Sequence, residues 1–248
     1  MKRIKCVISY DGSEFFGYQV QISERTVQSE IERVLKQMHR RDIRVTASGR
    51  TDAGVHALGQ VIHFGTDLKL PPDAWVRALN TMLPEDIAVL EAEIVPVDFH
   101  ARYGAVGKKY MYKVDLGKIR NPLNRDYAFH YPYALDIGRM KEAVHYLVGE
   151  HDFTSFSSAR SEVKDKVRTI YGIDCIQEGT ELTLTFKGSG FLYNMVRILS
   201  GTLIEVGSGK REPHEMKDIL LKKDRAAAGK TAPPQGLYLC EVYYGSEC

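Results

Sequence analysis

The residues best suited to chemistry in this sequence lie in one short segment, Ser48-Gly49-Arg50-Thr51-Asp52-Ala53-Gly54-Val55-His56-Ala57. Gly49 and Gly54 allow tight backbone paths that side chains would block. The positive charge of Arg50 favours the ionised form of the Asp52 carboxyl. Such a carboxylate, held in a pocket, can act as a nucleophile or a general base. An Asp beside Gly also commonly does no more than satisfy its own backbone in a turn, so these residues alone leave both interpretations open.

The elements around this segment predict that it is a loop between two strands, where reactive groups are often presented. Residue periodicity predicts strands at 2–10, about 43–48, about 58–65 and about 87–96, a helix opened by Thr26 as N-cap, and a helix from Pro71 or Pro72 to about Leu83. The order β-α-β-β-α-β is that of a ferredoxin-like unit.

The second half of the chain is expected to repeat that order. Its pattern predicts strands at about 105–116, 167–178, 181–188 and 236–244, an irregular segment at 117–135, and helices at about 136–148, 192–206 and 213–222. We therefore expect an α/β protein of the α+β kind, with two ferredoxin-like halves, residues 1–103 and 104–248. Their mixed, mainly antiparallel sheets are expected to join around a central cleft.

Basic residues gather in two stretches, although the whole chain has 34 Lys and Arg against 32 Asp and Glu, a formal net charge of +2. The stretch 36–50 carries Lys36, Arg40, Arg41, Arg44 and Arg50. The stretch 97–125 carries Arg102, Lys108, Lys109, Lys113, Lys118, Arg120 and Arg125, interleaved with tyrosines. Cations neutralise phosphates and aromatic faces stack on unpaired bases, so this mixture is typical of RNA binding. A solvated strand edge with half-buried tyrosines is the alternative.

Composition excludes several classes of protein. Hydrophobic residues make up 44% and charged residues 27%, the profile of a globular chain rather than a disordered one. No apolar run approaches the length of a membrane span, and the run at the N-terminus ends at Asp11-Gly12, too early for a signal peptide. The four cysteines form no CxxC pair. We expect a cytoplasmic protein with no metal site and no cofactor.

The segment Ser48–Val61 resembles the signature loop of the tRNA pseudouridine synthase A (TruA) family, in which the Asp is the nucleophile. Further motifs resemble the same family in order along nearly the whole chain: Tyr10-Asp11-Gly12, Phe16-Gly17-Tyr18-Gln19, Phe99-His100-Ala101-Arg102, Lys109-Tyr110-Met111-Tyr112, Asp152-Phe153-Thr154-Ser155-Phe156, Phe191–Arg197 with Gly201, and Gly236-Leu237-Tyr238-Leu239.

This resemblance implies isomerisation of uridine to pseudouridine at positions 38, 39 and 40 of the tRNA anticodon stem-loop. Asp52 corresponds to the nucleophile, which attacks either the ribose C1′ or the uracil C6. Tyr110 corresponds to the active-site tyrosine and Arg197 to the arginine that pairs with the aspartate. Arg50 corresponds to a residue that holds the target nucleotide out of the helix, and Leu239 to one that lines the uracil pocket.

The resemblance also implies that the central cleft between the two halves is an RNA cleft. It further implies that the protein is a homodimer whose partner is tRNA, with no membrane and no metal involved. Five basic residues from the two stretches are the candidates for RNA contacts: Arg40, Arg41, Arg102, Lys108 and Lys109.

Two other functions use the same features. A non-catalytic tRNA-binding module needs only the basic and aromatic stretches. A nucleoside hydrolase would use the same carboxylate without rejoining the base, although such enzymes usually need a second carboxylate to manage water. No partner acid stands out near Asp52 in the sequence.

Overall fold

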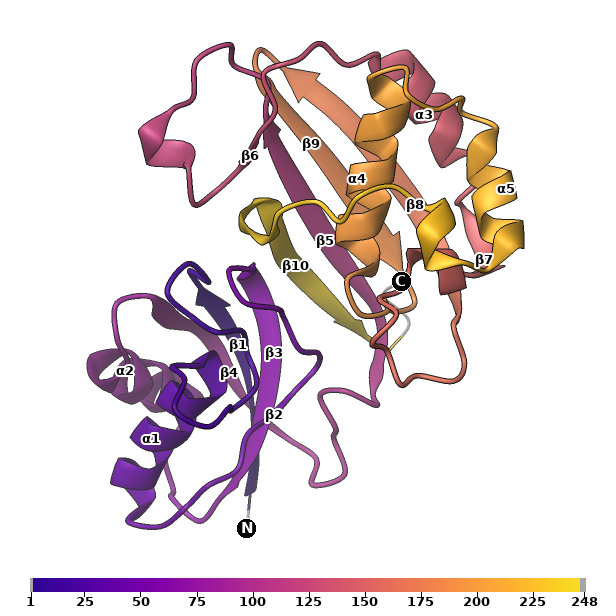
Figure 1. Ribbon diagram of the computed structural model, residues 1–248. Coiled ribbons are helices and arrows are strands. Elements are labelled where there is room, and N and C mark those ends of the chain that lie inside the picture. Colours follow the sequence, from indigo (N-terminus) through magenta and orange to yellow (C-terminus); the bar gives the residue numbers. More distant parts are fainter. Residues whose placement is uncertain (1, 246–248) are drawn as a thin grey trace. The chain divides into compact units, whose positions relative to one another are not determined.

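The computed structural model describes residues 2–245 and divides the chain into two compact units. Among the described residues, unit 1 comprises residues 2–106 and 238–245, and unit 2 comprises residues 107–237. The described parts of both units combine a sheet with helices (Figure 1). The assignment of residues 1–103 and 104–248 to two lobes stays a prediction, as does the expected RNA cleft.

Unit 1 is built on a sheet in which β1 pairs antiparallel with both β3 and β4. The elements follow in the order β1 (Lys2–Tyr10), α1 (Val27–His39), β2 (Thr46–Ala47), β3 (His56–Thr66), α2 (Pro72–Met82) and β4 (Ile87–Val95). β2 pairs antiparallel with β3, and β10 (Leu237–Tyr244) pairs parallel with it. The predicted order β-α-β-β-α-β is therefore confirmed for this half of the chain.

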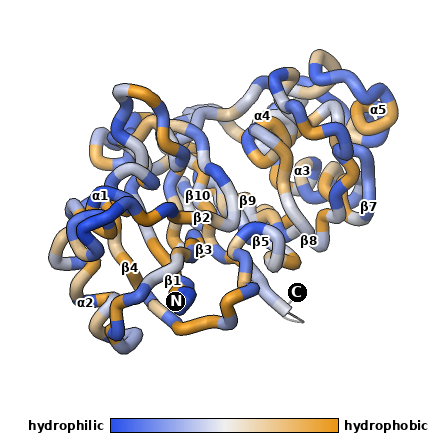
Figure 2. Tube along the Cα trace, turned by 90° about the horizontal axis from the view of Figure 1, so that it is seen from below, coloured by the Kyte–Doolittle hydropathy of each residue, from blue (hydrophilic) through white to orange (hydrophobic). Residues whose placement is uncertain are grey.

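Alternation along β1 shows how the sequence specifies this sheet. Ile4, Cys6, Ile8 and Tyr10 are buried, whereas the residues between them are partly exposed. Residues two apart in a strand face the same side, so this pattern fixes which face meets the core. The helix α1 begins at Val27. Its N-cap is Thr26, as predicted, and the Thr26 side chain accepts a hydrogen bond from the backbone N–H of Ser29. Figure 2 shows hydrophobic and hydrophilic residues interspersed along α1.

Unit 2 contains a second, antiparallel set of strands in the order β5-β9-β8-β7. Its elements are β5 (Ala105–Asp115), β6 (Phe129–His130), α3 (Ile137–Val144), β7 (Gly149–Asp152), β8 (Val167–Glu178), β9 (Glu181–Gly188), α4 (Met195–Gly207) and α5 (Glu215–Lys222). The expectation of mixed α+β structure with mainly antiparallel sheets is confirmed.

The predicted boundaries were wrong at three places. The strand expected at about 43–48 is reduced to two residues, Thr46–Ala47. The helix expected at 136–148 ends at Val144, and a short strand, β7, follows at Gly149 with a positive φ of 108°. Glycine adopts that backbone conformation readily, so Gly149 can begin the strand β7 at this point. The segment expected to be irregular at 117–135 contains the short strand β6, which pairs parallel with the end of β5.

Buried His63 on β3 gives unit 1 a pH-dependent stability. The residue is 7% exposed, and its Nδ1 accepts a hydrogen bond from the backbone N–H of Ala101 at 3.1 Å. Burial, with a smaller contribution from the positive charge of Arg3, lowers the pKa of His63 from 6.5 to about 4. Between these two values the unfolded chain binds a proton that the folded chain excludes, so the folded state loses stability as the pH falls.

We expect this residue to cost about 2 kcal/mol of the free energy of unfolding between pH 6.5 and pH 4. Denaturant titrations at several pH values would measure the slope. His63→Asn keeps an acceptor for Ala101 and should remove the acid-side loss, whereas the same change at exposed His214 should leave it intact. Equal slopes for both variants would contradict the assignment to His63.

Among residues 2–245, no helix combines the length and the apolar character needed to cross a membrane. Two of the cysteines, Cys6 and Cys175, are buried free thiols whose pKa values burial raises to about 12. These two thiols are therefore protonated and unreactive at neutral pH. Cys248 lies outside the described residues.

Candidate active site

Asp52 lies, as predicted, in the loop between β2 and β3 of unit 1, and it is half-buried. The backbone N–H of Val55 donates to the Asp52 carbonyl at 3.2 Å and closes a four-residue turn. Gly54 is the third residue of that turn and has a φ of +75°. A type II turn requires a positive φ at this position, which glycine adopts without strain. The turn therefore fixes the backbone on the C-terminal side of the carboxylate.

A second segment, residues 10–18, holds this loop from the other side. The backbone N–H of Tyr18 donates to the Thr51 carbonyl at 3.0 Å, and that of Gly54 donates to the Phe15 carbonyl at 3.3 Å. Gly12 and Gly17 let the two backbones touch: a Cβ on Gly12 would lie 2.0 Å from the Val55 carbonyl oxygen, and one on Gly17 would lie 2.8 Å from that of Thr51. We call residues 10–18 the cradle of the Asp52 loop.

Buried side chains complete the support on both sides of Asp52. The Tyr10 hydroxyl hydrogen bonds to Thr51 Oγ1 at 2.7 Å. Gln60 of β3 donates through Nε2 to the Gly49 carbonyl at 2.9 Å and accepts from the Ser48 hydroxyl at 2.6 Å. Because these groups are buried, losing one partner would leave another polar atom unsatisfied. The chain is thus held on both sides of Arg50 and Asp52.

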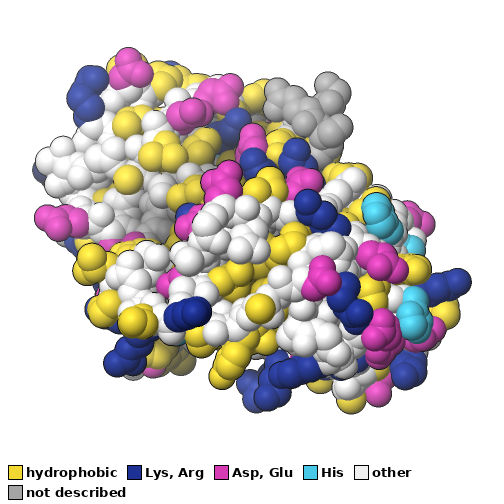
Figure 3. All heavy atoms as spheres, turned by 90° about the horizontal axis from the view of Figure 1, so that it is seen from above, with side chains coloured by type: hydrophobic (Ala, Val, Ile, Leu, Met, Phe, Trp, Pro, Cys, Tyr) yellow, Lys and Arg dark blue, Asp and Glu magenta, His cyan; other side chains and the backbone are white. Residues whose placement is uncertain are grey.

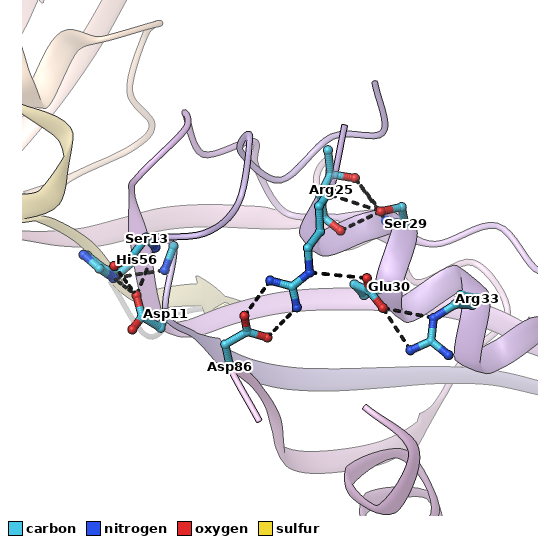
Figure 4. A network of polar contacts seen from close by, with 10 residues as sticks. Asp11, Ser13, Arg25, Ser29, Glu30, Arg33, His56 and Asp86 are labelled. Carbon is cyan, nitrogen blue, oxygen red and sulfur yellow. Dashed lines mark hydrogen bonds and ion pairs between the residues drawn. The ribbon is translucent and has the colours of Figure 1, made fainter. Parts of the chain in front are cut away.

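Charged residues anchor the cradle itself. Arg25 forms a bidentate pair with Asp86, at 2.7 and 2.9 Å, and its guanidinium lies 4.1 Å from the Phe15 ring centroid. Asp11 accepts from both the backbone and the hydroxyl of Ser13 (Figure 4). A two-point arginine–carboxylate contact fixes direction as well as distance, which suits a support for a rigid loop.

Buried His56 is the first residue of β3, and it connects the loop to β10. Its Nδ1 accepts a hydrogen bond from the backbone N–H of Gly12 at 3.0 Å, and its ring stacks on Tyr238 with centroids 4.7 Å apart. The register of the parallel strands then pairs Leu239 with Ala57. Leu239, the predicted uracil-pocket residue, is fully buried in unit 1.

Arg50 differs from its neighbours because its side chain is exposed. Within residues 2–245, no carboxylate lies at ion-pair distance from its guanidinium. An exposed cation on a rigid loop, two residues from the carboxylate, can contact a phosphate or a displaced base.

Tyr110 belongs to unit 2, where it lies on β5 opposite Phe186 of β9. Only 8% of it is exposed, and its ring meets Phe191 edge to face at a centroid distance of 5.2 Å. Edge-to-face packing of this kind fixes the plane of an aromatic ring. Tyr110 can therefore present a fixed face or its hydroxyl to a ligand.

Arg197 lies in the first turn of α4, also in unit 2, and is half-buried. Its Nε donates to the Ala232 carbonyl at 2.8 Å, and Nη1 donates to Asn194 Oδ1 at 3.0 Å. These two hydrogen bonds hold the Arg197 guanidinium in place, so the side chain does not extend freely into solvent. The predicted pairing of Arg197 with Asp52 stays a prediction.

The candidate RNA-contact residues lie on different elements of the two units. Arg40 is exposed at the C-cap of α1, and exposed Arg41 pairs with Asp67 at 2.6 Å. Arg102 is exposed with its guanidinium 5.8 Å from the Tyr103 ring, whereas Lys108 and Lys109 are half-buried on β5. On the face of Figure 3, basic and acidic side chains are interspersed. The expected RNA role of these residues stays a prediction.

No group of three or more potential metal-ligating side chains occurs among residues 2–245. Sequence reasoning missed the cradle as a functional part. Its motif was recognised by resemblance, but the spacing of residues in the sequence does not predict a contact between Gly12 and Val55. The Asp11-Gly12 and Gly17 positions were the only signal, since glycine is favoured where two backbones approach closely.

Comparison with known proteins decides the family. The family model described as "tRNA pseudouridine synthase" matches residues 6–104 and 143–245. The chain belongs to this family. Its members are isomerases that convert uridine to pseudouridine.

Relatives align along almost the whole chain. A protein of Geobacillus sp. (strain WCH70) is 56% identical over 244 residues, covering 98% of each chain. Proteins of Bacillus pumilus (strain SAFR-032) and Listeria innocua serovar 6a are 55% and 56% identical, covering 98% of this chain and 99% and 100% of theirs. All three are named tRNA pseudouridine synthase A. A chain from a Cbf5-Nop10-Gar1 complex aligns with 95% of this chain and 57% of its own, at 13% identity and a TM-score of 0.35.

Proposed function

We propose that this protein isomerises uridine to pseudouridine at positions 38, 39 and 40 of the tRNA anticodon stem-loop, with Asp52 as the nucleophile. The observation that carries the proposal is the Asp52 loop. It is held by the Gly54 turn on one side and the cradle on the other, and it presents exposed Arg50 beside a half-buried carboxylate. A turn that merely joined two strands would not need backbone contact with a second, separately anchored segment.

The reaction needs no redox partner and no outside group. Asp52 attacks the ribose C1′ or the uracil C6, and the N-glycosidic bond breaks. The uracil turns over, its C5 bonds to C1′, and C5 gives up its hydrogen as a proton. The carboxylate is released unchanged, so atoms and electrons balance. A carboxylate can serve as such a temporary covalent partner.

Two residues of unit 2 are proposed to assist. Tyr110 would stack on the uracil and help to remove the C5 proton, which is supported by its fixed ring plane against Phe191. Arg197 would pair with Asp52 and keep it ionised, which is supported by the anchoring of its guanidinium on the Ala232 carbonyl and Asn194.

Two residues of unit 1 are proposed to handle the substrate. A base within a stem must be flipped out before any side chain can reach it, at a cost of a few kcal/mol. Arg50 would occupy the vacated space, which is supported by its exposure on the loop. Leu239 would line the apolar side of the uracil pocket. We further propose that the protein acts in the cytoplasm as a homodimer, with Arg40, Arg41, Arg102, Lys108 and Lys109 contacting RNA phosphates.

Tritium release from tRNA transcripts carrying [5-³H]uridine tests this proposal directly. Transcripts with a single uridine at position 38, 39 or 40 should each release tritium to solvent, because joining through C5 expels that hydrogen. A matched transcript with cytidine at all three positions should release none. Free labelled uracil would instead support the hydrolase, and tight binding without any release would support the binding module.

A further inference from the structure

The structure contains a cavity of about 350 Å³ that the proposed reaction does not use. It lies in unit 2, between the segment that joins β5 to β6 and the turn before β10. We call residues 117–128 the arm. Figure 1 shows the arm extending beyond the ends of β5 and β6. The lining residues are Asp115, Arg120, Asn121, Pro122, Asn124, Arg125, Ala128, His130 and Gln235.

We propose that this cavity binds a single nucleotide, with its base between the arm and Gln235 and its phosphate on Arg120. The inference goes beyond the proposed function and does not depend on it. All lining residues except Gln235 fall between residues 104 and 143, the part of the chain that the family model leaves unmatched. The cavity volume is in the lower part of the range found for small-ligand sites.

The cavity has a fixed neck, so it is more than a gap under a loose loop. Residue Asp115 pairs with His130, and the backbone N–H of Tyr131 donates to the Asp115 carbonyl at 2.8 Å. The imidazole of His130 hydrogen bonds through Nε2 to the Gly117 carbonyl at 2.8 Å, which joins the two ends of the arm. Because this nitrogen must donate to a carbonyl, Nδ1 of the neutral ring is an acceptor.

The residues on either side of Gln235 pack closely against β5. A Cβ on Gly236 would lie 2.7 Å from the Lys113 carbonyl oxygen and 2.9 Å from the Tyr112 ring. Buried Tyr112 also donates from its hydroxyl to the Pro233 carbonyl at 2.8 Å. These contacts fix the backbone of the turn on both sides of Gln235, which is one of the residues that line the cavity.

The groups that face the cavity fit the parts of a nucleotide. The Arg120 guanidinium has no carboxylate at ion-pair distance among the described residues and is suited to a phosphate. Arg125 is partly neutralised, since its Nε pairs with Asp126 at 2.9 Å. The amides of Asn121, Asn124 and Gln235 supply both donors and acceptors, as the edge of a base requires.

The remaining lining residues favour a flat ring over a bare anion. Pro122 and Ala128 contribute apolar wall, and arginine planes stack on bases. Asp115 accepts from the backbone N–H of Gly117 through Oδ1 at 2.9 Å, and its carboxylate would repel a free anion placed beside it.

Calorimetric titration of the full-length protein with UMP, CMP, AMP, GMP and inorganic phosphate tests the inference. At least one mononucleotide should bind more tightly than phosphate alone. Arg120→Gln and Gln235→Ala should each weaken it about tenfold, the value of one charged or well-placed hydrogen bond. Lys118→Gln is the matched control, because Lys118 is exposed on the same arm and does not line the cavity.

Nucleotides that bind no more tightly than phosphate, or three variants that behave alike, would overturn the proposal. Adding tRNA to the nucleotide-loaded protein then separates the two sources of the ligand. Displacement of the mononucleotide by tRNA would mean that the cavity takes a nucleotide of the RNA. Simultaneous binding of both would mean that it takes a free nucleotide. Neither readout uses isomerisation, so failure here is distinct from failure of the proposed function.

Discussion

Replacing Asp52 by asparagine is expected to reduce the rate of tritium release from tRNA by at least about 10⁴-fold, the scale of losing a covalent nucleophile. Asparagine keeps the size of the side chain and one of its two acceptor oxygens, but its neutral amide cannot form the covalent bond to the substrate. The backbone contacts of the loop, from Thr51, Asp52 and Gly54 to their partners, do not involve the carboxylate. The variant should therefore fold as the wild type does.

The same variant should bind tRNA within about threefold of the wild-type affinity, because removing a negative charge does not weaken contacts to phosphates. Asp42→Asn is the matched control. Its side chain is exposed and makes a surface pair with Lys36 at 2.9 Å, which contributes little to stability. Single-turnover release and filter binding would measure both quantities. Release by Asp52→Asn at more than a tenth of the wild-type rate would refute the nucleophile assignment.

The sequence predicted the elements with a strong period well, because burial reinforces what local propensity favours. The alternation of Leu182, Leu184 and Phe186 predicted β9 within its observed bounds, Glu181–Gly188. The helix opened by Thr26 was equally clear, since an N-cap and an apolar stripe point to the same start. Where the local propensity and the pattern of burial predict the same element, tertiary contacts change its bounds little.

The short strands could not be predicted, because their pairing comes from distant parts of the chain. β6 and β7 have two and four residues, and each exists only through its neighbour, β5 or β8. No periodicity can be read from segments of this length. The arm cavity escaped prediction for the same reason, since it needs Gln235 and the residues before β6 on opposite sides.

The sequence predicted the loop on which the candidate residues lie, but not the contacts that support this loop. Asp52 and Arg50 were found from residue type and resemblance, and the structure confirms their loop between two strands. The roles of Gly12 and Gly17 depend on contacts with residues some 40 positions away in the sequence. A Cβ added to Gly12 or Gly17 would lie 2.0 or 2.8 Å from a backbone oxygen of the Asp52 loop. A single sequence carries no record of such a contact beyond the glycine itself.

Gly12→Ala is expected to lower kcat for tritium release by about 100-fold or more while leaving the affinity for tRNA nearly unchanged. The new Cβ would lie 2.0 Å from the Val55 carbonyl oxygen and 2.5 Å from its carbon, so one of the two backbones must move. The backbone N–H of Val55 donates a hydrogen bond to the Asp52 carbonyl, so a shift of Val55 would reach the nucleophile through that turn. A displacement of about 1 Å at a reacting group can cost 10²-fold in rate. The free energy of unfolding should fall by about 1–3 kcal/mol, as for other overpacked sites.

Two further variants keep this prediction decisive. Gly172→Ala on β8 is the matched control, because no atom lies within 4 Å of its added Cβ, and it should leave both activity and stability unchanged. Tyr10→Phe removes only the hydroxyl that bonds to Thr51 and should lower kcat about five- to tenfold, even if Gly12→Ala fails to fold. If both cradle variants released tritium at the wild-type rate, the loop would position Asp52 without the cradle. A parallel loss of tRNA affinity and rate would instead place the cradle in substrate binding.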